Sequence, residues 1–232
     1  MRERASKKSS PIPRVLPRGR HKLDPEVVAA SQRLRLLEAI AELVTEHGYA
    51  AVTIGDIATR AGTAKRTFYD HFPDKLACFL AALDEITDKL VEAVGRFFAV
   101  PGTVRERCEY SLRGYLELLA SMPSTSKRFY LEAMSEGPEA ADRRMAMHLK
   151  FARHIVTLSR DAERLAEGRE ITEQHALGVV GALHALIFHQ VHLHGPESLR
   201  EIISEVVPLA VAFLTARVAP QPRDARPRKR AG

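Results

Sequence analysis

Apolar residues recur at helical spacing from residue 25 to about residue 217, in segments that are bounded by Gly or Pro. In the first segment Leu36, Ile40 and Leu43 repeat with the period of about 3.6 residues that places them on one face of a helix. No segment alternates apolar and polar residues over a length that would make a strand. The sequence therefore predicts an all-α fold.

Capping signals predict where the first helices begin and end. Asp24 and Pro25 are typical of a helix start, and Gly48 is typical of its end. Thr53 and Asp56 have the spacing of a capping box for a second, short helix. Later helices are expected at about 64–72, 74–100, 103–121, 125–136, 139–166, 172–194 and 197–217, with a kink at Pro208 in the last.

Positive charge is concentrated at the two ends of the chain. Residues 1–24 contain eight Lys or Arg and two acids, and residues 218–232 contain five Lys or Arg and one acid. The segment between them carries 22 cations and 26 acids, so it is net acidic. We expect disordered basic arms at 1–24 and 218–232, which either neutralise the phosphates of a nucleic acid or only increase solubility.

Composition limits the class of protein. The apolar content of 45% supports a sizeable core, and two cysteines, Cys78 and Cys108, do not make a disulfide framework. The basic N-terminus has no apolar segment behind it, so no secretory signal is expected. The longest weakly polar stretch, 176–188, is shorter than the roughly 20 residues of a membrane span. We expect a soluble cytoplasmic protein with no membrane partner.

Two short helices joined by a glycine-containing turn, Ala61-Gly62-Thr63-Ala64, are typical of a helix-turn-helix. On the second helix Ala64, Phe68 and Phe72 share a face at positions i, i+4 and i+8, which predicts that they point inward. The opposite face carries Lys65, Arg66, Tyr69 and Asp70. Such a face suits the major groove of DNA, although a solvated helix with incidental charge remains the alternative.

The sequence from about residue 35 to residue 86 resembles the TetR (tetracycline-repressor-like) family of transcriptional regulators. The shared pattern consists of a Thr cap, Ile57-Ala58, Ala61-Gly62 and Thr67-Phe68-Tyr69-x-His71-Phe72-x-x-Lys75. The resemblance implies a three-helix DNA-binding domain, at 25–76, followed by a larger helical regulatory and dimerisation domain, at 77–217. It also implies a homodimer formed by the helices at 172–194 and 197–217, where an intramolecular core is the alternative.

The same resemblance implies roles for individual residues. Thr53 and Tyr69 are implied as DNA backbone contacts, and Lys75 as a phosphate contact at the start of the fourth helix. Lys65, Arg66 and Thr67 occupy positions where bases or phosphates are contacted. His71 is implied either as a phosphate contact or as a partly buried structural residue.

The start of the recognition helix departs from the family pattern. Thr63 and Ala64 stand where a small aliphatic residue and a capping residue are common, and Thr63 is a candidate cap. Which of residues 63–66 reach DNA bases therefore stays open. Asp70 would repel phosphate, so an intramolecular ion pair or a cytosine contact is expected for it.

Aromatic and Met residues of the C-terminal part are candidates for lining an apolar ligand cavity, with ordinary core as the alternative for each. These candidates are Phe97, Tyr110, Tyr115, Phe129, Tyr130, Met134, Met147, Phe151 and Phe188.

Histidines are frequent in the same part of the chain. His189 and His192, at i and i+3, have the spacing of two metal ligands, but no Cys or carboxylate group accompanies them, and no metal or cofactor is expected. The other histidines there are His148, His154, His175, His184 and His194.

The sequence contains no phosphate-binding Gly loop, nucleophile elbow or HExxH helix, so no enzyme activity is expected. The interpretation is a ligand-responsive regulator, more a repressor than an activator, that binds a near-palindromic operator as a homodimer. A transcriptional activator or a ligand-independent architectural DNA-binding protein is the alternative.

Overall fold

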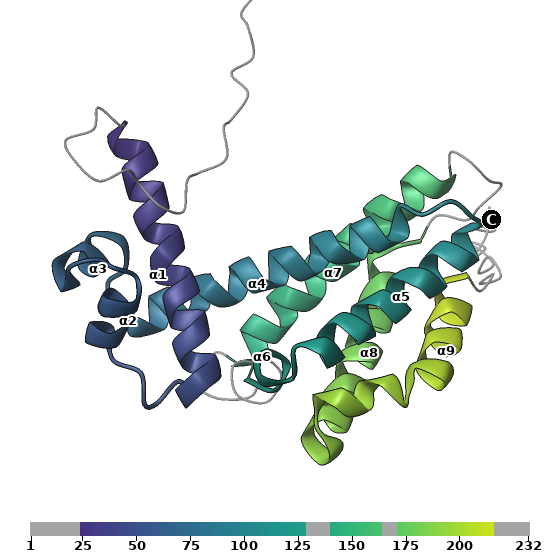
Figure 1. The fold of residues 1–232 in the computed structure, drawn as a ribbon. Helices are drawn as coiled ribbons and strands as arrows, with labels where there is room; N and C mark the ends of the chain where they lie inside the picture. The colour runs from purple at the N-terminus through teal and green to yellow at the C-terminus, as the bar shows by residue number, and fades with distance from the viewer. Residues whose placement is uncertain (1–23, 129–139, 164–170, 216–232) are drawn as a thin grey trace, which may run out of the picture.

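The computed structural model describes residues 24–128, 140–163 and 171–215, and within these ranges the chain forms helices and connecting turns without strands (Figure 1). The all-α prediction is confirmed. The predicted basic arms lie outside the described residues, apart from Asp24.

The chain order of the helices is as follows. They are α1 (Pro25–His47), α2 (Ile54–Arg60), α3 (Lys65–His71), α4 (Lys75–Phe98), α5 (Val104–Ser121), α6 (Pro123–Lys127), α7 (Ala140–Glu163), α8 (Glu173–His194), the 3₁₀ helix η2 (Pro196–Arg200) and α9 (Ile203–Thr215).

Helix ends follow the predicted capping signals. Asp24 Oδ1 accepts a hydrogen bond from the backbone N–H of Glu26 at 3.0 Å, at the start of α1. The capping box of α2 is present, and at α4 the carboxylate of Asp74 accepts from the N–H of Ala77 at 2.8 Å. Gly48 ends α1 with a φ of 81°, a left-handed value that glycine adopts without strain. These boundaries are confirmed.

Two predicted helices differ from the structure. The helix expected at 125–136 begins at Pro123, which suits a first helical turn, and the predicted residues from 129 onward lie outside the described ranges. The single helix expected at 197–217 is divided into η2 and α9. Over η2 the N–H groups of Ser198 and Glu201 each donate three residues back, so the chain turns more tightly than an α-helix before α9 begins.

The long helix α4 connects the two ends of the molecule. α1, α2 and α3 gather at one end of α4, while α5, α7, α8 and α9 pack at the other (Figure 1). The buried apolar cluster runs continuously from Leu36 and Ile40 of α1 through Leu83 of α4 to Ile187 and Val211. A division into domains at residue 76 therefore stays a prediction.

Helix α8 is unusually apolar for a helix that is partly exposed. Only 33% of its most apolar 18 residues are buried. By length and composition alone α8 is long and apolar enough to cross a membrane. The prediction that the longest weakly polar stretch is shorter than a membrane span was therefore wrong. In the fold, α8 packs against α7, η2 and α9.

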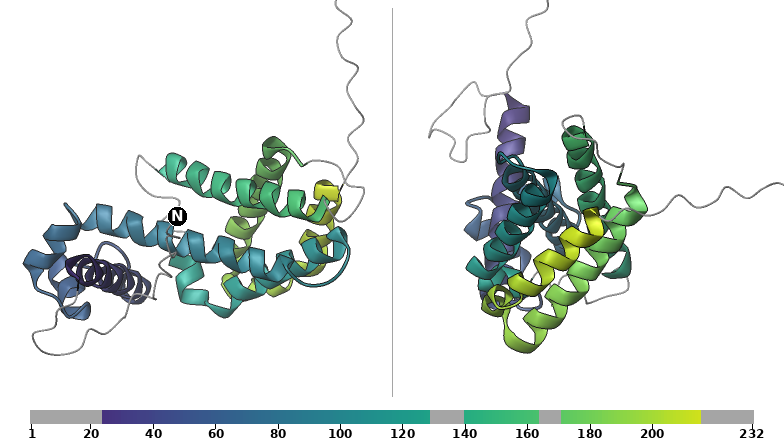
Figure 2. Two further views of the ribbon diagram at one scale, coloured as in Figure 1. Left: turned by 90° about the horizontal axis from the view of Figure 1, so that it is seen from above. Right: turned by 90° about the vertical axis from the view of Figure 1, so that its right-hand side faces the viewer.

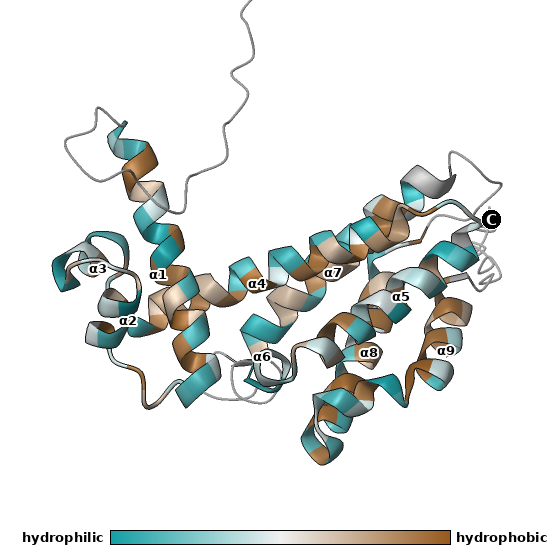
Figure 3. Cartoon of the chain, in the orientation of Figure 1, coloured by the Kyte–Doolittle hydropathy of each residue, from teal (hydrophilic) through white to brown (hydrophobic). Residues whose placement is uncertain are grey.

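Helices α8 and α9 lie alongside each other (Figure 2, right). Both helices carry hydrophobic residues, drawn in brown in Figure 3. Large apolar side chains that are more than two-fifths exposed there are Leu186, Leu193, Leu209 and Phe213. We call these four residues the α8–α9 apolar face.

Candidate functional site

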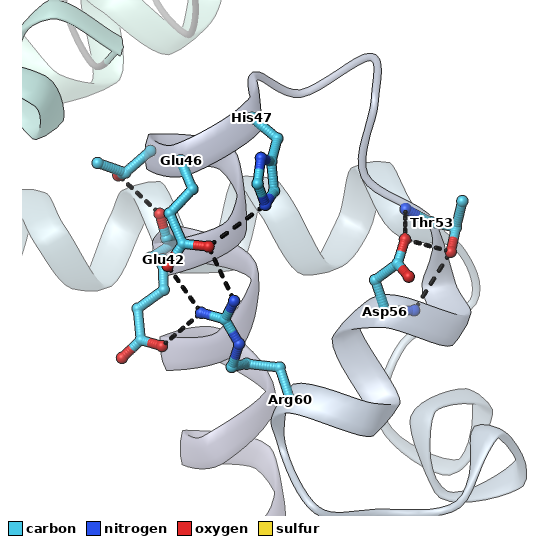
Figure 4. A network of polar contacts seen from close by, with 8 residues as sticks. Glu42, Glu46, His47, Thr53, Asp56 and Arg60 are labelled. Carbon is cyan, nitrogen blue, oxygen red and sulfur yellow. Dashed lines mark hydrogen bonds and ion pairs between the residues drawn. The ribbon is translucent and has the colours of Figure 1, made fainter.

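Helix α2 is held against α1 by charged side chains. The guanidinium group of Arg60 donates to Glu42 at 3.2 Å and to both carboxylate oxygens of Glu46 at 2.9 and 2.8 Å (Figure 4). The hydrogen bond from Arg60 lowers the pKa of the Glu46 carboxyl group. These bonds set the position of α2 at the C-terminal end of α1.

The start of α2 is closed by Thr53 and Asp56. The Thr53 N–H and hydroxyl donate to the Asp56 carboxylate at 2.9 and 2.6 Å, while the Asp56 N–H donates to the Thr53 hydroxyl oxygen at 3.2 Å (Figure 4). Hydrogen bonding from Thr53 lowers the pKa of Asp56. Thr53, a predicted DNA contact, is exposed, but its hydroxyl hydrogen is already donated inside the protein.

The turn between α2 and α3 is fixed from α1. Gly62 has a φ of 63°, and the guanidinium of Arg35 donates to the carbonyl oxygen of Ala61 at 2.9 Å. Arg35 thus binds the C-terminal carbonyl end of α2, where a cation is favourable. The sequence analysis did not identify Arg35, since only its position beside the buried stripe of α1 distinguishes it from other surface arginines.

The predicted cap at Thr63 was wrong. Its hydroxyl points back to α2, where it lies 3.4 Å from the carbonyl oxygen of Ala58, and Ala64 is the residue at the N-cap of α3. No side chain accepts a hydrogen bond there. Ala64 is exposed and has an extended backbone, so the prediction that it points inward with Phe68 was also wrong.

Helix α3 has one buried and one exposed face. Phe68 is fully buried, Phe72 is 4% exposed, and their ring centroids lie 5.8 Å apart. On the other side Lys65, Arg66 and Asp70 are exposed, and the Tyr69 ring is 53% exposed. Thr67 lies partly buried between the two faces. The structure therefore places the four residues predicted for the outer side of this helix on one exposed surface with Thr67 at its edge, and we call these five residues the α3 face (Lys65, Arg66, Thr67, Tyr69 and Asp70).

His71 lies beside this surface rather than on it. Its Nε2 atom is 3.4 Å from the side-chain oxygen of Gln32 on α1, and the residue is partly buried. Burial lowers the pKa of the His71 imidazole, and Arg33 nearby acts in the same direction. A partly buried ring beside α1 fits the structural role that was the alternative for His71.

The side chain of Lys75 points into the protein. Its ammonium group donates to the carbonyl oxygens of Tyr49 at 2.9 Å and Val52 at 2.8 Å. An ammonium group has three N–H donors, so one remains for another acceptor. The fourth-helix lysine therefore binds the loop between α1 and α2.

An apolar cavity of about 50 Å³ lies between α4, α5, α7 and α8. Of the predicted ligand residues it is lined by Tyr115, Met147 and Phe151, and the rings of Tyr115 and Phe151 pack edge to face at 5.6 Å. The other lining residues are Val94, Leu112, Ile155, Val180, Leu183, His184 and Ile187.

The remaining ligand candidates lie elsewhere. Phe97 and Tyr110 pack against each other at 6.3 Å, and Phe188 stacks on His192 at 6.0 Å. None of these three lines the apolar cavity. Three candidates, at 129, 130 and 134, lie outside the described residues.

Two histidines meet at the polar wall of the cavity. The ring of His184 on α8 lies 4.7 Å from the ring of His148 on α7, edge to face. Burial lowers the pKa of His184 to about 4, with further contributions from His148 and Arg144. His184 is therefore neutral at physiological pH. In the described ranges no three His, Cys, Asp or Glu side chains gather at metal-binding distance.

Residues 36–82 match the family model described as bacterial regulatory proteins, tetR family. The segment from α1 to the start of α4 is thus similar to the tetR family. The matched residues begin in α1, contain all of α2 and α3 and end in α4, so the α3 face lies inside the matched segment.

Similar proteins extend the comparison beyond this domain. The HTH-type transcriptional activator FasR from Mycolicibacterium smegmatis is 32% identical over 88 residues, which cover 38% of this chain and 40% of that protein. The fatty acid degradation regulator FadR from Bacillus halodurans has a TM-score of 0.61 at 17% identity, and the match covers 85% of this chain and 100% of FadR.

A second similar structure is the transcriptional regulator FadR from Bacillus subtilis, solved in complex with stearoyl-CoA. Its TM-score is 0.57 at 17% identity, and the match covers 78% of this chain and 98% of that chain. At 17% identity the similarity of these two structures to this chain shows a shared fold. That fold includes α1 to α4 and the helices that follow them.

Proposed function

We propose that this protein is a homodimeric transcriptional regulator that binds a near-palindromic DNA operator through α3. The observation that carries the proposal is the α3 face. It presents Lys65, Arg66 and Tyr69 outward while Phe68 and Phe72 hold the opposite side in the core of the segment that matches the tetR family. A short helix held in this way fits the major groove, where Arg and Lys recognise guanine edges.

Each residue near this face has a proposed role in DNA binding. Lys65 and Arg66 contact bases or phosphates, Thr67 and Tyr69 contact the DNA backbone, and the exposed Thr53 does so at the start of α2. Lys75 reaches phosphate only with its third N–H donor. The basic arm at 1–24 adds phosphate contacts that carry no sequence information.

The α8–α9 apolar face supports the homodimer. Large apolar side chains exposed on two helices that pack together favour an interaction site, and a two-fold dimer would bury the same face of both copies. Two DNA-binding domains related by that symmetry would match the two halves of a palindromic operator.

The apolar cavity supports a small apolar effector. Two similar structures are FadR regulators, one of them bound to stearoyl-CoA, which favours an aliphatic acyl compound as the effector of this protein. The effector would lower operator affinity by binding more tightly to a dimer whose α3 helices are wrongly spaced. Helix α4, which contacts both α1 and the walls of the cavity, is the element that would transmit the change.

Repression is the proposed mode of regulation in the cytoplasm. Activation is the second candidate, because the relative from Mycolicibacterium smegmatis is a transcriptional activator.

The experiment is a binding-site selection with the purified protein, followed by footprinting of the selected DNA with and without a panel of small apolar compounds. We expect a near-palindromic motif, protection of both half-sites by one dimer, and loss of protection with at least one compound. Recovery of no enriched motif would refute sequence-specific DNA binding, and protection that no compound changes would favour the ligand-independent architectural protein.

A further inference from the structure

A groove of about 420 Å³ opens between α4 and α7 on the outside of the protein. Its inner surface is apolar and includes Leu80, Leu83 and Met147, while its rim carries the charged side chains of Asp84, Asp142 and Arg143. Thr87 and Ala146 complete the lining. The groove thus combines an apolar floor with a polar rim, which suits a ligand that has both kinds of surface.

Met147 lines the groove and also lines the apolar cavity between α4, α5, α7 and α8. It is 4% exposed, so its side chain is buried beside both spaces. Methionine is unbranched and has three rotatable side-chain bonds, which allow it to change conformation at low cost. Met147 is therefore a flexible side chain that the walls of the cavity and of the outer groove share.

The cavity by itself is smaller than a typical ligand site. Ligand sites commonly enclose about 300–1,000 Å³, and water occupies about 30 Å³ in the liquid. The inner cavity of about 50 Å³ is too small for an effector, whereas the groove of about 420 Å³ approaches the required size but is open to solvent. Joined past Met147, the two spaces would together reach that size.

The rest of the α4–α7 contact is closed beyond the groove. The ammonium group of Lys150 lies 3.2 Å from Asp84 and 3.0 Å from Asp88, across the two helices. Farther along, a side-chain carbon on Gly95 would lie only 2.7 Å from Nε2 of His154, so the backbone of α4 meets α7 directly there. α4 and α7 run side by side through this region (Figures 1 and 2). Met147, which lines both spaces, is therefore the position at which a ligand in the groove would reach the cavity.

We propose that Met147 is the movable partition of a two-part binding site for an amphipathic ligand with an unbranched aliphatic chain. The chain passes Met147 into the apolar cavity, and the polar head stays in the groove, where Arg143 on the rim carries positive charge. This inference rests on the proposed function, of which it specifies the effector site. Free fatty acids and acyl thioesters share this chemistry.

Substitutions at two neighbouring methionines test the partition. Met147→Trp fills the passage, Met147→Ala opens it, and Met145→Trp is the matched control, because Met145 is 50% exposed on the same helix and lines neither space. The chain contains no tryptophan, so each Trp variant carries a single fluorophore. Emission from the Met147→Trp variant should be shifted to shorter wavelength than emission from the Met145→Trp variant.

Binding is measured by calorimetry on the full chain with octanoyl-, dodecanoyl- and stearoyl-coenzyme A and with the three free acids. For the wild type and Met145→Trp we expect affinity to increase with chain length. For Met147→Trp we expect this dependence to disappear and stearoyl binding to weaken at least about tenfold. For Met147→Ala we expect equal or tighter binding of the longest chain. Stronger binding of either the thioesters or the free acids identifies which of these two classes is the natural ligand.

Two results would overturn the partition. One is identical binding of every probe by Met147→Trp and Met145→Trp, and the other is a wild type that binds no chain. Operator binding is measured on the same samples. A protein that binds its operator but no aliphatic chain would refute the role of Met147 and leave the proposed function in DNA binding intact. Thermal melts check folding, and Met147→Phe replaces Met147→Trp if the latter does not fold.

Discussion

The ammonium group of Lys75 donates to the carbonyl oxygen of Tyr49 and lies 4.2 Å from the centre of the Tyr49 ring. The Tyr49 ring in turn packs on Phe79 at 4.7 Å, and a second carbonyl, that of Val52, accepts from Lys75. The first turn of α4 is thereby joined to the loop between α1 and α2. If the proposed effector displaces α4, this contact would carry the displacement to the loop between α1 and α2.

Lys75→Met should destabilise the protein as well as weaken DNA binding. The substitution leaves two partly buried carbonyl groups without their charged donor, a loss of about 1–3 kcal/mol in unfolding free energy. Lys65→Met, the same change at an exposed position of α3, should shift stability by only about ±0.5 kcal/mol. Denaturant unfolding of both variants measures the difference. Wild-type stability of Lys75→Met together with weaker DNA binding would instead make Lys75 chiefly a phosphate contact.

The two faces of α3 should respond differently to truncation. Phe68→Ala removes a fully buried ring and should cost about 3–5 kcal/mol of stability, so the DNA-binding domain should unfold. Arg66→Ala should leave the thermal melt nearly unchanged and, if the guanidinium binds a guanine edge, cost roughly 1–3 kcal/mol at one base position.

Binding-site selection with Arg66→Ala and Lys65→Ala, alongside the wild type, checks the α3 face. Recovery of the wild-type motif at wild-type affinity by both variants would mean that α3 does not recognise bases. The thermal melts serve as the folding control, since only Phe68→Ala should lose its cooperative transition.

Helix positions followed from the sequence because their signals are local. Asp24, Thr53 and Asp74 are capping residues whose partners lie within three residues, and Phe68 shows its burial through the periodicity of a single helix. The α3 face was predictable for the same reason. Where local signals were weak the prediction failed, as at Thr63, which bonds to Ala58 rather than capping α3.

Contacts between distant residues were not predictable from the same signals. Arg35 is 26 residues from Ala61, and Lys75 is 26 residues from Tyr49, so no spacing rule connects them. The division of residues 196–215 into η2 and α9 likewise depends on tight hydrogen bonds around Ser198 that a helical periodicity does not reveal. The position of Met147 beside both spaces depends on how α4, α5, α7 and α8 pack.

Stability should decrease as the pH falls below neutrality, with His184 as a main contributor. Burial holds the folded pKa of His184 at about 4, below the value of about 6.5 for an unfolded histidine. The unfolded state therefore takes up a proton first, so stability is present above about pH 6.5 and is lost between there and about pH 4.

Thermal melts between pH 7 and pH 5 measure this loss. Because His184 is partly exposed, we expect its share to be only about 1 kcal/mol, or roughly 2–4 °C for a chain of this size. His184→Leu should flatten the pH dependence, whereas His189→Leu, at an exposed position of the same helix, should leave it unchanged. Equal pH dependence in both variants would assign the loss to other groups.

Charge placed on the α8–α9 apolar face should separate the two protomers of the dimer. Leu186 and Leu209 are 44% and 69% exposed in the single chain, so Leu186→Glu with Leu209→Glu should leave the protomer folded. In a two-fold dimer each substitution brings carboxylates into a desolvated apolar interface, where unpaired charges are strongly unfavourable. We expect the mass of a monomer in light scattering and loss of binding to a full operator. Met145→Glu, which places a carboxylate at an exposed methionine of α7, should remain dimeric and bind the operator. An unchanged circular dichroism spectrum would show that the double variant is folded, and a folded double variant that stays dimeric would place the interface on another surface.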